Sequence, residues 1–220
     1  MVLSVHIPKT GGVSIRNILK AHYGPRFFTY YWELRDAYGN RMSGVPTAPA
    51  CVHGHFPADQ FAGQVPKAQL VTWVRDPVER VVSSYYYRLR EPDWQHPVCR
   101  ELHAKQLSLI DYAALPLVRN EMTRFLGSRK PADFLFIGVM EEFEESLRRM
   151  TERLRIPPAA PRHDNFNPDR TSPRYELDRV IRQDIAALNE ADVALYEECL
   201  RLFISRAGSN RPAPAMPWGP

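Results

Sequence analysis

Long apolar runs are absent from this sequence, and cysteine is scarce in it. No segment approaches about 18 consecutive apolar residues, so we expect no integral membrane segment. The three cysteines, Cys51, Cys99 and Cys199, are odd in number and far apart. They predict no disulfide framework and favour a reducing compartment, which points to a cytoplasmic protein. A secretory signal peptide is not indicated either, because no basic segment precedes the apolar residues 2–7.

Charge of one sign is not concentrated anywhere in the chain. The 29 basic residues exceed the 25 acidic ones by a formal net charge of +4, and only five of the basic residues are lysines. Without a block of consecutive basic residues, we expect no nucleic-acid partner. Arginine suits bidentate contact with phosphate, sulfate or carboxylate. A net charge of this size indicates chiefly a soluble surface, so charge alone does not assign an anionic ligand.

What is present is the composition of an ordinary globular protein. The chain has 220 residues, of which 44% are hydrophobic and 25% charged. This length fits one domain, which we expect to span residues 1–206. Residues 207–220 contain four prolines and little apolar periodicity, which predicts an extended C-terminal tail.

Short apolar runs alternate with helical patterns along the chain. The runs at residues 2–7, 51–56, 69–74 and 134–139 predict buried strands. Apolar residues at helical spacing follow three of these runs and recur near the C-terminus. Strands that alternate with helices indicate an α/β fold, in which helices cover both faces of a central parallel sheet.

The segment between the first strand and its helix has the composition of an anion-binding loop. Gly11 and Gly12 allow the backbone to curl around an anion, and N–H groups at a helix start point towards it. Lys9 adds a charge, and Thr10 and Ser14 add hydroxyl groups. The lysine precedes the glycines, so this is not the loop of nucleoside triphosphatases. The alternative is a plain glycine turn into a helix.

A second candidate follows the strand at residues 69–74. Asp76 is suited to cap a helix there, and Glu79 has the spacing of a capping box. Arg75 lies just beyond the strand, and Ser83 follows two helical turns later. The two side chains could bind one anion along the helix. Alternatively, Arg75 pairs with an acidic neighbour and Ser83 lies on the helix surface.

A third candidate is the histidine segment at residues 51–56. Cys51, His53 and His55 are two residues apart, so in a strand they share one face. Imidazole suits base catalysis near neutral pH, whereas a structural zinc site would need a fourth ligand. A hydrogen-bonded histidine in the core is the third possibility. The other histidines are scattered along the sequence: His6, His22, His96, His103 and His163.

Together these clusters resemble the sulfotransferases that use 3′-phosphoadenosine 5′-phosphosulfate (PAPS) and release the bisphosphate PAP. The resemblance is greatest to the carbohydrate branch typified by heparan sulfate 2-O-sulfotransferases. It rests on the loop at residues 8–14, the histidine segment 53–56 and the stretch 75–87. Residues 120–126, 137–143 and 188–196 are also similar to bacterial members, so the resemblance runs from about residue 2 to 203. It implies a three-layer, P-loop-type α/β fold.

The resemblance also implies roles for individual residues. The 5′-phosphosulfate would be bound by the loop residues Lys9, Thr10, Gly11, Gly12, Val13 and Ser14, with Val13 in place of a common hydroxyl residue. The 3′-phosphate would be bound by Arg75 and Ser83, with Ser84 a weaker candidate. His55 would be the catalytic base, Lys9 would neutralise the leaving group, and His53 would orient the base or the acceptor. Residues Thr171, Ser172 and Arg174 would close over the nucleotide.

The reaction implied is in-line transfer of a sulfuryl group to a hydroxyl of a carbohydrate-type acceptor, without a metal. The membrane anchor and stem of the animal Golgi enzymes do not precede the first strand, which again favours a cytoplasmic enzyme. Two alternatives remain: a kinase-like phosphotransferase that needs Mg²⁺, and a non-catalytic nucleotide-binding protein.

Overall fold

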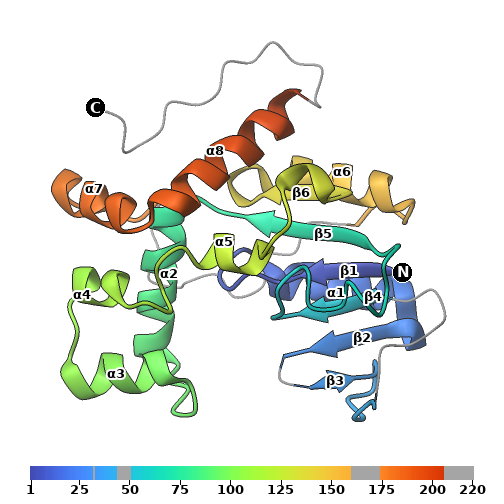
Figure 1. Ribbon diagram of the computed structural model, residues 1–220, viewed down its shortest axis with the longest axis horizontal. Coiled ribbons are helices and arrows are strands. Elements are labelled where there is room, and N and C mark those ends of the chain that lie inside the picture. The colour runs from blue at the N-terminus through green and yellow to red at the C-terminus, as the bar shows by residue number, and fades with distance from the viewer. Residues whose placement is uncertain (32, 44–50, 160–173, 206–220) are drawn as a thin grey trace. The chain divides into compact units, whose positions relative to one another are not determined.

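The protein is described by a computed structural model that covers residues 1–31, 33–43, 51–159 and 174–205. Its residues group into two compact units, each made of two stretches of chain. The first unit combines residues 1–74 with 124–165, and the second combines residues 75–123 with 166–220. Figure 1 shows the helices and strands of both.

The first unit is built on a six-stranded sheet. Its strands are β1 (Val2–Val5), β2 (Phe27–Tyr30), β3 (Leu34–Arg35), β4 (Cys51–Gly54), β5 (Gln69–Val74) and β6 (Phe136–Val139). The spatial order is β3-β2-β4-β1-β5-β6, with β3 and β6 at the two edges (Figure 1). Every neighbouring pair is parallel except β2 and β3. The predicted parallel sheet is therefore confirmed, and two strands that the sequence did not predict, the parallel β2 and the short antiparallel β3, extend one side of it.

Two longer helices of this unit pack on the sheet. Helix α1 (Gly12–Tyr23) contacts β2 and β4, and helix α6 (Phe143–Leu154) contacts β6. The described residues of this unit also form three short 3-10 turns, η1 (Gly24–Arg26), η2 (Pro131–Asp133) and η3 (Met140–Glu142), and the end of α5. All four residues of β1, β4 and β6 are buried, as expected for parallel strands covered on both faces.

The second unit is helical. It contains α2 (Pro77–Arg90), α3 (Pro97–Lys105), α4 (Leu109–Ala114), the start of α5 (Glu121–Leu126), α7 (Arg179–Leu188) and α8 (Glu190–Ser205). Its apolar core draws on α2, α3, α4 and α7. Val81 and Val82 of α2 are fully buried there, as is Tyr112 of α4.

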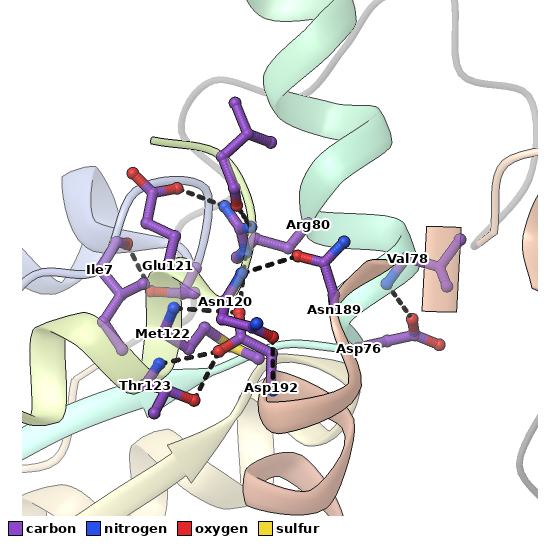
Figure 2. Close-up of polar contacts among 12 residues, drawn as sticks. Ile7, Asp76, Val78, Arg80, Asn120, Glu121, Met122, Thr123, Asn189 and Asp192 are labelled. Atoms are coloured by element: carbon purple, nitrogen blue, oxygen red, sulfur yellow. Dashed lines mark hydrogen bonds and ion pairs between the residues drawn. The ribbon is translucent and has the colours of Figure 1, made fainter. Parts of the chain in front are cut away.

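A buried polar network connects three helices of this unit. Arg80 of α2 is fully buried; it forms an ion pair with Glu121 and donates to the carbonyl of Val118 at 3.0 Å (Figure 2). Asp192 of α8 lies 3.9 Å from the Arg80 Nε. Asp192 also accepts hydrogen bonds from the backbone N–H groups of Met122 and Thr123 at the start of α5. Asp192 thus caps one helix from another, close to a buried arginine.

In the part of the chain that the structure describes, no helix is long and apolar enough to cross a bilayer. The predicted tail at residues 207–220 lies outside the described residues, as do Thr171 and Ser172.

Candidate functional site

The loop before α1 has the backbone of a tight, left-handed turn. Lys9 has a φ of 70° and Gly11 a φ of 81°, both in the left-handed region. A Cβ at Gly11 would also come within 2.8 Å of the Met140 sulfur. Gly11 is the N-cap of α1, and the first turn of α1 has no side-chain cap and no acidic residue. With Lys9 beside it, this helix start has the charge and donors that suit a phosphate or sulfate group.

Two residues of the loop have structural tasks that the sequence did not predict. The hydroxyl of Thr10 donates to the carbonyl of Ile7 at 2.8 Å, and Thr10 is fully buried. Its proton therefore stabilises the turn and is not directed at a ligand. A Cβ at Gly12 would overlap the ring of His6. Gly12 is therefore required by the approach of that ring, whereas Gly11 is required by its φ.

The start of α2 confirms the predicted helix cap. The Asp76 carboxylate accepts hydrogen bonds from the N–H groups of Val78 and Glu79, at 2.9 and 3.1 Å. These N–H groups are therefore already used by a carboxylate. An anion near this segment would therefore be bound by side chains. Arg75 is the basic residue nearest in sequence to the start of α2.

Arg75 has the acidic neighbour that the alternative interpretation required. Its Nη2 lies 3.8 Å from Glu79 Oε2, and both side chains are buried. Arg182 of α7 lies 3.2 Å from the other oxygen, Oε1, and the N–H of Tyr175 also points to this carboxylate at 3.2 Å. One carboxylate thus forms ion pairs with two buried guanidinium groups.

The two serines of α2 differ in their surroundings. Ser83 is buried, with 9% of its surface exposed. The hydroxyl of Ser84 lies 2.7 Å from the Tyr112 hydroxyl inside the helical core. This contact gives Ser84 a structural role, which leaves Ser83 as the stronger candidate of the two.

The structure brings three histidines together: His53, His55 and His6, which is distant from the other two in the sequence. Strands β1 and β4 are parallel neighbours with Ser4 beside His53, and the His6 N–H donates to the Gly54 carbonyl at 2.8 Å. The His6 ring stacks on the His55 ring at 4.4 Å and on the His53 ring at 5.1 Å. Parallel pairing therefore places His6 beside the histidine segment, although the two lie far apart in the sequence.

His55 has one defined tautomer when neutral. Its Nδ1 lies 2.7 Å from the backbone carbonyl oxygen of His6. A carbonyl oxygen only accepts, so Nδ1 carries the hydrogen and the lone pair of the neutral ring is on Nε2. That arrangement is the one a general base needs.

His53 is suited to a different role. Its Nδ1 lies 2.9 Å from the Ser4 hydroxyl, and only 1% of its surface is exposed. Burial, with the charge of His55 next in importance, lowers the pKa of His53 to about 3. Burial likewise raises the pKa of the Cys51 thiol. Both side chains remain neutral near pH 7, and His53 is a poor proton acceptor there.

A metal centre was the remaining possibility for the histidine segment. Within the described ranges, no three His, Cys, Asp or Glu side chains are grouped as metal ligands. The rings of His6, His53 and His55 stack on one another, whereas ligands would direct their lone pairs to a common point.

Residues 1–197 match the model of a protein family described as "Sulfotransferase family". The chain belongs to the sulfotransferase family. The match extends over parts of both units, from β1 into α8.

Two solved sulfotransferases are similar in structure. The crystal structure of a sulfotransferase from Alicyclobacillus acidocaldarius has 18% sequence identity and a TM-score of 0.50, over 90% of this chain and 95% of that one. A mouse sulfotransferase, SULT7A1, complexed with PAP has 16% identity and a TM-score of 0.41, over 71% of this chain and 58% of that one. The first likeness shows the fold, so the predicted P-loop-like α/β class is confirmed. None of the curated proteins matches the chain.

The sulfotransferase has site neighbours that sequence reasoning missed. They are His6 and Arg182. For His6 a signal existed, because the ends of neighbouring parallel strands meet at one sheet edge. For Arg182 there was none, since it lies 107 positions after Arg75 in the sequence. Arg174, predicted to close over the nucleotide, is exposed just before α7.

Proposed function

We propose that this sulfotransferase uses PAPS and transfers the sulfuryl group to a hydroxyl of a carbohydrate-type acceptor. We further propose that it is of the heparan sulfate 2-O type, and that residues 1–206 act as one cytoplasmic sulfotransferase domain. The observation that carries the proposal is the hydrogen bond from His55 Nδ1 to the His6 carbonyl, which leaves Nε2 as the proton acceptor. A hydroxyl nucleophile needs such a base, because its own pKa is high.

The loop before α1 fits the 5′-phosphosulfate of PAPS. We assign this group to Lys9, Gly11, Gly12 and Ser14, with Thr10 acting through the shape of the turn and Val13 through its backbone. The left-handed turn and the uncapped start of α1 support the assignment. PAPS, when bound, supplies an activated sulfuryl group on a phosphate leaving group.

The remaining assignments concern the 3′-phosphate and the nucleotide. We assign the 3′-phosphate to Arg75 and Ser83. The two guanidinium groups gathered at Glu79 support the assignment, because guanidinium suits bidentate contact with phosphate. Thr171, Ser172 and Arg174 are assigned to the segment that covers the nucleotide.

In this mechanism, His55 accepts a proton and Lys9 stabilises a developing negative charge. His55 accepts the proton of the acceptor hydroxyl at Nε2, and the His6 carbonyl stabilises the imidazolium that forms. Lys9 neutralises the negative charge that develops on the leaving group, a contribution typically worth ~10²–10³ in rate. His53, whose Nδ1 contacts the Ser4 hydroxyl, orients the base or the acceptor and takes no proton.

A nucleotide screen tests the cofactor. The protein is heated with adenosine 3′,5′-bisphosphate, ADP or GDP, each with and without Mg²⁺. A ligand at 100 times its Kd stabilises a protein by about 2.7 kcal/mol, a clear rise in Tm. We expect the bisphosphate to stabilise without metal. Stabilisation by ADP or GDP only with Mg²⁺ would show a phosphotransferase.

An acceptor panel tests the transfer itself. Radiolabelled PAPS is incubated with uronic-acid polysaccharides and with simple alcohols, and sulfated product is measured. Transfer to a 2-hydroxyl of a uronic-acid polysaccharide is the expected result. Bisphosphate binding without transfer to any acceptor would instead support a non-catalytic nucleotide-binding protein.

A further inference from the structure

His6 lies where the loop, the catalytic histidine and the neighbouring strand meet. Its backbone carbonyl accepts the His55 Nδ1–H, and its backbone N–H donates to Gly54. Its ring lies 4.4 Å from the His55 ring, with an interplanar angle of 25°. The His6 ring also stacks on the His53 ring, with a centroid distance of 5.1 Å and an interplanar angle of 21°. The backbone of His6 therefore fixes the tautomer of His55, and its ring fixes the plane.

The same ring also touches the start of α1. A Cβ at Gly12 would overlap the His6 ring, so the ring occupies the space that a side chain at Gly12 would fill. The anion-binding loop and the His55 ring are thus supported by one side chain. A shift of the His6 ring would move the His55 plane and loosen the contact with the loop at the same time.

The charge state of His6 is suited to this position. The titratable and charged groups around it are His53 and His55 on the strand side, Arg16 and Lys9 on the loop and α1, and Tyr31, whose hydroxyl lies 3.4 Å from Nδ1. Burial, then His53 and His55, hold the pKa of His6 well below its usual value. A neutral ring can stack on the imidazolium of His55, whereas a charged one would repel it.

We propose that the His6 side chain is a positioning residue for sulfuryl transfer, which holds the His55 ring in its productive plane against the anion-binding loop. This inference rests on the proposed role of His55 as the base. It assigns to His6 an effect on turnover that exceeds its effect on cofactor binding, because the ring contacts His55 directly and the loop only at Gly12. A displacement of about 1 Å at a reacting group is enough to cost ~10²-fold in rate.

The test compares two substitutions of His6, one that removes the planar ring and one that keeps it. His6→Ala removes the stack, and His6→Phe keeps a planar ring on His55 without imidazole nitrogens. We expect kcat to fall by ~10–10²-fold in His6→Ala and to recover most of that loss in His6→Phe. The Kd for adenosine 3′,5′-bisphosphate should change far less than kcat in both. His22→Ala, at an exposed position of α1, is the matched control and should leave kcat and Kd unchanged.

The outcomes separate this inference from the proposed function. Wild-type protein that neither binds the bisphosphate nor transfers sulfate overturns both. Active wild type with an equally active His6→Ala variant overturns the positioning role alone. A parallel fall of kcat, bisphosphate affinity and Tm, without rescue by His6→Phe, also overturns it, because that pattern is structural. If His6→Ala does not fold, His6→Asn replaces it in the comparison with His6→Phe.

Discussion

At the scale of single residues, His55 and His53 have the same side chain in different surroundings, which suit them to different roles. His55 is partly buried and donates Nδ1–H to a carbonyl, whereas His53 is buried beside Ser4. The sequence placed both on one face of a strand and could not choose between them without the family resemblance. The choice depends on the carbonyl of His6, a backbone group that no residue pattern reveals.

The first prediction concerns the base. His55→Ala should lower kcat by ~10²–10⁴-fold, the usual worth of a positioned base. Affinity for adenosine 3′,5′-bisphosphate, measured by calorimetry, should stay at the wild-type value, because the nucleotide is assigned to other residues. His22→Ala serves as the control. An equal loss of nucleotide affinity would make His55 a structural residue.

The second prediction concerns Arg75. Wild-type protein should prefer adenosine 3′,5′-bisphosphate over adenosine 5′-monophosphate, and Arg75→Ala should lose most of this preference. A charged hydrogen bond is worth about 1.5–3 kcal/mol, so the ratio of the two Kd values should fall ~10–10²-fold. Arg90→Ala, at an exposed position near the end of α2, should keep the ratio. A ratio that survives in Arg75→Ala would limit Arg75 to its ion pair with Glu79.

At the scale of elements, the sequence predicted those with a strong local signal. The strand expected at residues 69–74 has those bounds as β5, and the cap at Asp76 begins α2 as expected. Helices α3 and α4 and strands β2 and β3 were not predicted. Strand β3 has two residues, and α3 buries only Val98, Cys99 and Leu102, so neither offers enough periodicity for recognition. Their formation depends on packing within their own unit.

Helix-to-helix capping by Asp192 leads to the third prediction. Its carboxylate caps α5 and lies beside the buried Arg80. Asp192→Ala should lower the free energy of unfolding by about 3–5 kcal/mol, because it leaves a buried guanidinium with less compensation. Urea denaturation measures the loss. Asp184→Ala, at an exposed position of α7, should stay close to wild type, and equal midpoints for the two variants would contradict the capping role.

At the scale of the whole molecule, the net charge of +4 gave no indication of function, and the pattern of motifs gave the family. The order of loop, histidine segment and arginine motif along the chain was readable without a structure. The contact of Glu79 with Arg182 was not, because it joins residues about one hundred positions apart. Long-range electrostatic partners of this kind depend on the fold.

The buried histidines also determine how the stability of the molecule depends on pH. In the folded protein the pKa of His53 is lowered to about 3, and that of His6 lies well below its usual value of 6.5. Below pH 6.5 the unfolded chain binds protons that the folded protein does not, so stability is complete above that pH and falls as the pH decreases towards 3. The slope of the unfolding free energy is about 1.4 kcal/mol per pH unit for each such histidine.

Urea unfolding at pH 7.5, 6.5 and 5.5 should show this loss of stability. His53→Asn should reduce the slope by the contribution of about one proton. Ser4→Ala removes only the hydrogen bond to His53, so it should lower stability by a similar amount at each pH. Identical slopes for wild type and His53→Asn between pH 6.5 and 5.5 would mean that His53 is not held neutral by the fold.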